Sequence, residues 1–232
     1  MVASIRRFLD LQAGSLWRDM RILLPVSEGT FLDVGCGAQP FRRLIPETVL
    51  YTGIDTADAE SHFGYKVPNT LYFEGTTWPI ADNSVETILC TETIEHVLDP
   101  STVLDEARRC LKPGGRFILT VPFAARWHYI PHDYWRFTPS SLQHLLTLSG
   151  FSQIAVYSRG DQLTVACYKA MALFTPWLFP QSGSPVVRLL RQFAGLLLSP
   201  IFILLAVIGN LSLRASFGDD CLGYTILAMR ST

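Results

Sequence analysis

The feature that most constrains the fold of this chain is a glycine-rich turn after a short apolar run. Residues 31–34 read Phe-Leu-Asp-Val, and the Gly35 and Gly37 that follow allow a tight turn and the close approach of a ligand. A second apolar run ends at Asp55, twenty residues after Gly35. We therefore expect two buried parallel strands that place Asp33 and Asp55 at a ligand-binding edge, where Asp55 accepts hydrogen bonds from a ribose diol.

The third position of this turn separates two kinds of nucleotide ligand. A dinucleotide fingerprint has glycine there, but this chain has Pro40, and the next possible helix, residues 41–45, is cut by Pro46. A pyrophosphate favours a long helix whose N-terminus points at it. The sequence therefore favours a ligand without phosphates, such as S-adenosylmethionine, over NAD.

Apolar runs and helical patterns alternate from residue 30 to residue 158. Asp99 is a suitable N-cap with Pro100 in the first turn, and apolar residues recur at helical spacing up to Leu111. We expect Pro-Gly-Gly at residues 113–115 to end this helix, before a strand at residues 116–121. Such alternation predicts a parallel sheet with helices on both faces.

These segments resemble the class I S-adenosylmethionine-dependent methyltransferases, particularly their type-11 branch. The resemblance rests on the glycine turn, residues 70–85, the Glu-His-Val of residues 95–97 and the Leu-Lys-Pro-Gly-Gly of residues 111–115. It implies a Rossmann-like, doubly wound, seven-stranded α/β sheet, mostly parallel with an antiparallel last strand. Further strands are then expected at residues 70–74, 85–91, 151–158 and 221–229. Glu86 stands where the family more often has Asp, which leaves its role open.

The resemblance also implies which residues bind S-adenosylmethionine. They are Asp33, Gly35, Gly37, Asp55, Glu74, Gly75 and Thr91. Glu74 stands where the family usually has an Asp that binds the adenine amino group. We expect methyl transfer to a small-molecule, glycan or lipid-linked acceptor, at oxygen. The alternatives are an NAD-type Rossmann oxidoreductase and a non-catalytic cofactor-binding membrane scaffold.

The loop of residues 122–137 is the predicted acceptor site, because it leaves the ligand-binding edge of the sheet and is rich in aromatic and titratable side chains. His132 and Asp133, together with His96 after the fourth strand, are the candidate catalytic residues, since a hydroxyl acceptor needs a base. In the alternative interpretation, Asp133 simply pairs with Arg136 and the aromatic residues belong to the core.

Composition limits the partners and the compartment. The net charge of −1 offers no basic surface for nucleic acid, so we expect no nucleic-acid partner. The five cysteines form no Cys-x-x-Cys pair, which predicts buried thiols in a reducing compartment and no metal site. No secretory signal pattern opens the chain. We therefore expect a cytoplasmic enzyme.

A long apolar stretch before the last strand departs from a minimal methyltransferase. Residues 192–213 carry no charge and are long enough to cross a bilayer. If the sixth and seventh strands share one sheet, a single crossing is excluded. We expect residues 163–213 to attach to the inner face of the membrane, in plane or re-entrant, interrupted by Pro176, Pro180, Pro185 and Pro200. A buried subdomain and a homodimer interface stay open as alternatives.

These patterns predict three segments. The first is an N-terminal capping helix region, residues 1–28, which the resemblance implies covers the cofactor pocket. Packing on the sheet and contact with an anionic membrane surface are the alternatives. The methyltransferase domain comprises residues 29–160 and 219–232. A hydrophobic helical insertion comprises residues 161–218.

Overall fold

The structure is a computed structural model that describes the whole chain except residues 1, 60–66, 179, 181 and 215–219. The chain divides into two compact units. The sheet unit comprises residues 19–157 and 223–232, and the helical unit comprises residues 1–18 and 158–222. The predicted boundaries at residues 28 and 160 stay predictions, and the one at 218–219 lies outside the described residues.

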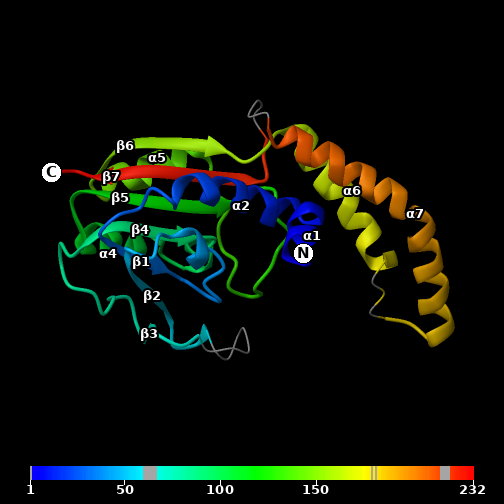
Figure 1. The fold of residues 1–232 in the computed structure, drawn as a ribbon, viewed down its shortest axis with the longest axis horizontal. Coiled ribbons are helices and arrows are strands. Elements are labelled where there is room, and N and C mark those ends of the chain that lie inside the picture. Colours follow the sequence, from blue (N-terminus) through cyan, green and yellow to red (C-terminus); the bar gives the residue numbers. More distant parts are fainter. Residues whose placement is uncertain (1, 60–66, 179, 181, 215–219) are drawn as a thin grey trace. The chain divides into compact units, whose positions relative to one another are not determined.

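The sheet has seven strands in the order β3-β2-β1-β4-β5-β7-β6 (Figure 1). The pairs from β3 to β5 are parallel, whereas β7 runs antiparallel to β5. This arrangement confirms the predicted fold class. The strands are β1 Thr30–Val34, β2 Leu50–Thr56, β3 Thr70–Phe73, β4 Val85–Thr91, β5 Leu111–Pro122, β6 Phe151–Ser158 and β7 Gly223–Arg230.

Strand β5 begins earlier than the sequence predicts. The Pro-Gly-Gly of residues 113–115 lies inside the strand and does not separate it from the preceding helix. Val85 pairs with Leu111 and Thr87 with Arg116, so β4 advances two residues while β5 advances five. A bulge therefore absorbs the segment that we expected to be a turn, because pairing with β4 resumes on both sides of it.

Helices cover the sheet and are started by local caps. Figure 1 shows α4 Pro100–Cys110 and α5 Pro139–Leu148 on one face of the sheet. The Asp99 side chain accepts a hydrogen bond from the Ser101 N–H at 3.0 Å, and Thr138 forms a capping box. The possible helix at residues 41–45 is a single 3₁₀ turn, η1 Arg42–Leu44. The core lies along β4 and β5, whose central apolar side chains are fully buried.

The helical unit contains α1 Val2–Leu9, the first part of α2 Leu11–Leu23, α6 Gln162–Leu178 and α7 Pro185–Ser212. Helices α6 and α7 pack against each other as a hairpin (Figure 1). A Cβ atom on Gly195 would lie 2.6 Å from the Trp177 carbonyl oxygen, so only glycine lets the helices approach this closely. Near the base of the hairpin, Asn210 donates a hydrogen bond to the Phe8 carbonyl at 2.9 Å.

The prediction that proline interrupts α7 is wrong. Pro185 begins the helix, where no N–H is needed, and the helix continues through Pro200. Pro200 has no N–H to donate to the Leu196 carbonyl, but the Ser199 hydroxyl donates to that carbonyl at 2.7 Å. The lost backbone bond is thus replaced by a side-chain bond. Helix α6 likewise contains Pro176.

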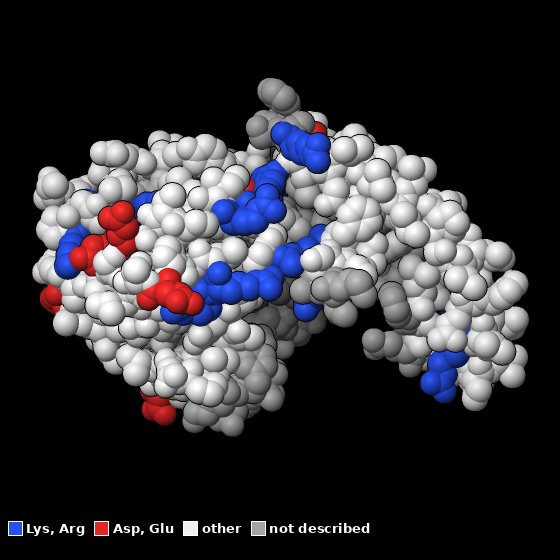
Figure 2. Space-filling model, viewed as in Figure 1, with Lys and Arg blue, Asp and Glu red and all other residues white. Residues whose placement is uncertain are grey.

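Helix α7 is long and apolar enough to span a membrane. It has 28 residues, and its most apolar 18-residue window has a mean hydropathy of 2.2 with only 17% of the window buried. At about 1.5 Å per residue it is roughly 42 Å long. Its exposed side chains include Phe193, Leu196, Leu197, Ile203 and Leu204. The face in Figure 2 is uncharged along the hairpin until basic side chains appear at its far end.

Candidate functional site

The glycine turn after β1 is built as the sequence predicts. The N–H groups of Gly35 and Cys36 both donate to the Ile54 carbonyl of β2, at 3.0 and 3.1 Å. Gly35 has φ +63° and Gly37 φ +48°, conformations that glycine adopts without strain. A Cβ atom on Gly35 would lie 2.5 Å from the Thr93 hydroxyl oxygen. Any side chain at Gly35 would therefore displace the segment that follows β4.

Asp55 lies at the end of β2, beside this turn. Its two carboxylate oxygens accept hydrogen bonds from the Gly37 N–H at 2.9 Å and the Thr56 N–H at 2.8 Å. Burial raises the pKa of Asp55, and these two N–H groups oppose the rise. Each oxygen has a second lone pair, so the carboxylate is held in place while it can still accept from a ligand diol.

Asp33 is more deeply buried than Asp55, with 2% of its surface exposed. It accepts a hydrogen bond from the Tyr51 hydroxyl at 2.8 Å. Burial raises the pKa of Asp33 to about 7, which outweighs the opposing Tyr51 bond, and the charge of Asp55 adds to the rise. At neutral pH this carboxyl group is therefore poised between its protonated and ionised forms.

The other predicted cofactor residues lie at the same edge of the sheet. Asp55 pairs with Tyr72 of β3, so Glu74 and Gly75, which directly follow β3, emerge beside the end of β2. Both are exposed. Thr91 ends β4, and its carbonyl accepts from the Thr93 hydroxyl at 2.9 Å. By contrast, Glu86 is the second residue of β4, and it binds Lys112 and Thr30 at the opposite end of the strand from this edge.

His96 lies just after β4, in the short helix η2 Ile94–His96. Its Nδ1 is 2.7 Å from the His132 carbonyl oxygen. Because a carbonyl only accepts, Nδ1 carries the hydrogen and Nε2 carries the lone pair. Burial lowers the pKa of His96, so the ring is neutral near pH 7.

The loop after β5 folds around His96. The ring centroids of His128 and Tyr129 are each 4.9 Å from that of His96, in edge-to-face contact. The His132 ring is placed by a 2.9 Å hydrogen bond between its Nδ1 and the Tyr134 hydroxyl. The loop therefore brings His132 beside His96, although 36 residues separate them in the sequence.

Asp133 has several partners within this loop. Both of its oxygens accept from Arg136, at 2.6 and 2.7 Å, and one also accepts from the His128 N–H at 3.0 Å. The bond from Arg136 lowers the pKa of Asp133 to about 2. Asp133 is thus a charged residue that holds the loop in place. Its pairing with Arg136 is the one expected in the alternative to a catalytic role.

Two residues near His96 were missed as site residues. The Glu95 side chain is completely buried, and neither of its oxygens has a hydrogen-bond partner among the described residues. Glu95, His96 and His128 each offer a ligand atom, and these atoms lie within 4.8 Å of one another. The adjacency of Glu95 and His96 is visible in the sequence, but the approach of His128 depends on the loop conformation.

The chain matches known proteins across the region that carries the predicted cofactor residues. A family model described as a methyltransferase domain matches residues 32–119. The ubiquinone biosynthesis O-methyltransferase of Cereibacter sphaeroides is 31% identical over 171 residues, which cover 61% of this chain and 68% of that protein. The chain therefore belongs to the class I S-adenosylmethionine-dependent methyltransferases. It is an enzyme of the type-11 kind, and S-adenosylmethionine is its cofactor.

Solved structures share the fold at low identity. The phosphoethanolamine N-methyltransferase 2 of Haemonchus contortus has a TM-score of 0.55 and 14% identity, covering 94% of this chain and 52% of that one. The [4+2]-cyclase SpnF has a TM-score of 0.53 and 17% identity, covering 95% of this chain and 81% of that one. Because these two proteins differ in chemistry, the fold alone does not identify the acceptor.

Proposed function

We propose that this enzyme transfers a methyl group to a hydroxyl oxygen of a small-molecule acceptor that is held at a membrane. The observation that carries the proposal is the meeting, at one sheet edge, of the glycine turn with Asp55 and the histidine-rich loop around His96. A relative named as an O-methyltransferase of ubiquinone biosynthesis supports transfer to oxygen.

The residues at the glycine turn and the end of β2 fit S-adenosylmethionine. Asp55 is held by two N–H groups and still offers lone pairs to the ribose diol. Gly35 and Gly37 allow the backbone to approach the amino-acid tail, which bears an ammonium group that suits Asp33. Glu74, Gly75 and Thr91 complete the site around the adenine and the tail. When bound, the cofactor supplies a methyl group on a sulfonium, which an acceptor displaces in line to leave a neutral thioether.

A binding experiment tests this cofactor site. Calorimetry should show that the wild-type protein binds S-adenosylmethionine and not NAD. Asp55→Ala removes one or two charge-assisted hydrogen bonds of about 1.5 to 3 kcal/mol each, so we expect an affinity loss of roughly tenfold or more. Asp58→Ala, three residues further on, is the matched control. Equal affinity in both variants would remove Asp55 from the site.

Within the acceptor loop, His132 is the residue that we propose to accept the hydroxyl proton. Its ring is placed by Tyr134, while its backbone carbonyl fixes the tautomer of His96. Asp133 positions this loop through Arg136 and His128. His96, neutral near pH 7, then directs its Nε2 lone pair away from the His132 carbonyl and toward Glu95.

Turnover of His132→Ala tests this assignment. Removal of a general base typically lowers the rate about a hundredfold to ten-thousandfold. Cofactor affinity should stay unchanged, because His132 lies on the loop and not at the glycine turn. Since the acceptor is not identified, labelled methyl transfer into a cell extract serves as the readout. His144→Ala, on the exposed surface of α5, is the control. Full activity of His132→Ala would return the loop to a structural role.

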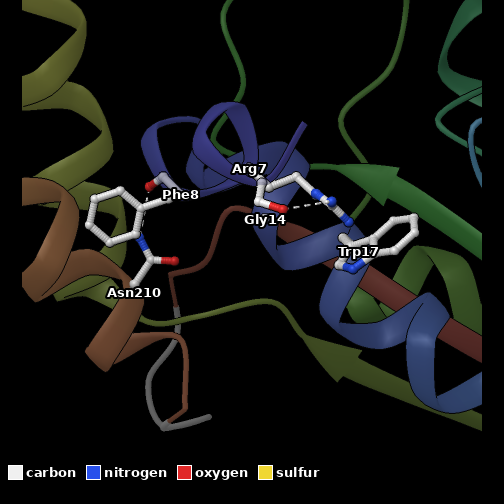
Figure 3. Close-up of a pocket in the computed structure, with 6 residues that line it drawn as sticks. Arg7, Phe8, Gly14, Trp17 and Asn210 are labelled. Atoms are coloured by element: carbon white, nitrogen blue, oxygen red, sulfur yellow. Dashed lines mark hydrogen bonds between the residues drawn. The ribbon is translucent and has the colours of Figure 1, made fainter. Parts of the chain in front are cut away.

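The helical unit supports a membrane-held acceptor. Helix α7 exposes apolar side chains for most of its length, and Arg188 and Arg191 lie in its first two turns. At the base of the hairpin, a groove of about 300 Å³ is lined by Ser4, Arg7, Phe8, Gly14, Trp17 and Asn210 (Figure 3). The Arg7 guanidinium lies 4.0 Å from the centre of the Trp17 ring. Apolar side chains beside basic ones suit the interface of an anionic bilayer.

Fractionation of the intact enzyme tests this attachment. We expect it in the membrane fraction of cells, released by detergent and retained after a high-salt wash, because apolar contacts are not screened by salt. A soluble, monodisperse protein without detergent would contradict membrane attachment. A soluble dimer would instead favour the interpretation of α7 as an interface between copies.

A further inference from the structure

The carboxyl group of Glu95 is the least satisfied polar group near the site. Its side chain has 0% exposure, and neither oxygen has a hydrogen-bond partner among the described residues. A buried carboxylate without partners is costly, because it loses the hydrogen bonds that water would supply. Such a group calls for a compensating positive charge or a proton.

Two imidazole rings offer their lone pairs beside this carboxyl group. The Nδ1 of His96 is 2.7 Å from the His132 carbonyl oxygen, and the Nδ1 of His128 is 3.0 Å from the Arg126 carbonyl oxygen. Since both carbonyls only accept, both Nδ1 atoms carry hydrogen, and both Nε2 atoms are left with lone pairs. The His128 Nδ1 also lies 3.2 Å from an Asp133 oxygen.

These hydrogen bonds to Nδ1 are of the kind that metal-binding histidines make. A ligating imidazole usually donates its other N–H to a carbonyl or a carboxylate, which fixes the tautomer and aims the lone pair. His96 has a carbonyl in this role, and His128 has both a carbonyl and the Asp133 carboxylate. Asp133 is itself held by Arg136.

The spacing also fits a metal ion. Ligand atoms about 2.0 to 2.2 Å from a tetrahedral zinc ion lie roughly 3.4 Å from one another. Glu95 Oε1 is 3.6 Å from His96 Nε2, close to that value. The ligand atoms of all three residues lie within 4.8 Å of one another. The His128 side chain is 43% exposed, so its ring has room to make the remaining adjustment.

We propose that Glu95, His96 and His128 bind a divalent transition-metal ion, with Zn²⁺ as the cation that suits two imidazoles and one carboxylate. The sequence analysis predicted no metal site, because the five cysteines are scattered along the chain. The proposal deepens the proposed function, on which its catalytic role rests: it adds a cation at the edge where β4 and β5 end.

The three protein ligands leave a coordination position for the acceptor. The cation would lower the pKa of an acceptor hydroxyl bound there. The hydroxyl proton then passes to His132, the oxygen lone pair forms the new O–C bond, and the C–S bond breaks with its electron pair returning to sulfur. Charge and atoms balance without any oxidant or reductant.

Zinc binding to the chelator-treated full-length protein tests the site directly. We expect one Zn²⁺ per chain by elemental analysis, at micromolar affinity or better in competition with a chromophoric chelator. Glu95→Gln and His128→Ala should each weaken binding by more than tenfold. Asp133→Asn, which removes the carboxylate beside His128, should weaken it by about 10 to 100-fold. His144→Ala, on α5, is the control that should leave zinc affinity unchanged.

Cobalt substitution provides a readout that does not depend on variants. Co²⁺ at this site should show d–d absorption without a cobalt–thiolate charge-transfer band, which excludes the five buried cysteines as ligands. Absence of binding at one Zn²⁺ per chain, or equal affinity in Glu95→Gln and His144→Ala, would overturn the proposal. Glu95 would then remain a buried carboxyl group whose pKa is raised by burial and by the charge of Glu92. Calorimetry with S-adenosylmethionine separates this failure from failure of the proposed function.

Discussion

The two units of this chain place their apolar residues in opposite environments. In the sheet unit, apolar side chains such as Ile88 and Leu89 are 0% exposed, because β4 is covered on both faces. In the helical unit, Leu196 and Leu197 of α7 are each 66% exposed. Similar residue types thus form a core in one unit and an apolar surface in the other. The difference indicates that the exposed apolar side chains of α7 are not there to form the core of the fold.

The strongest test of this difference compares two leucine truncations. Leu89→Ala should lower the free energy of unfolding by about 2 to 5 kcal/mol, because it leaves a cavity in the core. Leu197→Ala should change it by less than about 0.5 kcal/mol, as for an exposed position. Urea unfolding in detergent, followed by tryptophan fluorescence, measures both. A loss of several kcal/mol in Leu197→Ala would show that α7 is buried by protein.

A second comparison asks what the exposed face of α7 contacts. Phe193→Ser removes a side chain that is 62% exposed, and its burial in lipid would contribute about 1.5 to 3 kcal/mol. Binding to anionic vesicles should therefore weaken by roughly tenfold to a hundredfold in cosedimentation. Leu71→Ser, on β3 of the sheet unit and 45% exposed, is the control. Equal binding of both variants would contradict insertion of α7.

The elements fixed by local signals were predictable from the sequence. Strands β4 and β6 have the predicted bounds, since each is an apolar run between clear turn residues. The glycine turn placed Asp33 and Asp55 at one edge, because the carboxyl ends of neighbouring parallel strands must meet there. Asp99 and Thr138 cap their helices through contacts within three residues. In each case the determining contacts are close in sequence.

Two of the features that were missed depend on contacts distant in sequence, whereas the third depends on a local side-chain hydrogen bond that offsets the effect of a proline. The bulge in β5 follows from pairing with β4, which overrides the Pro-Gly-Gly signal for a turn. Helix α7 passes Pro200 because Ser199 replaces the lost hydrogen bond. The approach of His128 to Glu95 requires the whole loop of residues 122–137 to fold back, and no periodic pattern encodes such a path. The sequence therefore predicted which residues belong to the candidate site, but not which distant residues contact them.

The smallest expected effect is on the pH dependence of cofactor binding, through the raised pKa of the buried Asp33 in the sheet unit. The pKa of Asp33 is about 7 in the free enzyme, above its ordinary value of 3.8, so below pH 7 the group is mostly protonated. If Asp33 receives the cofactor's ammonium group, binding favours the ionised form and releases a proton. Affinity should then fall by up to about tenfold for each pH unit below 7 and level off just above it, until the cofactor's own amino group begins to lose its proton at about pH 8. Calorimetry in two buffers of different ionisation enthalpy should find about one proton released at pH 6 and less as the pH rises through 7. Asp33→Asn has no such group to titrate and should release none at pH 6. No proton release by the wild-type enzyme at pH 6 would place the ammonium group elsewhere.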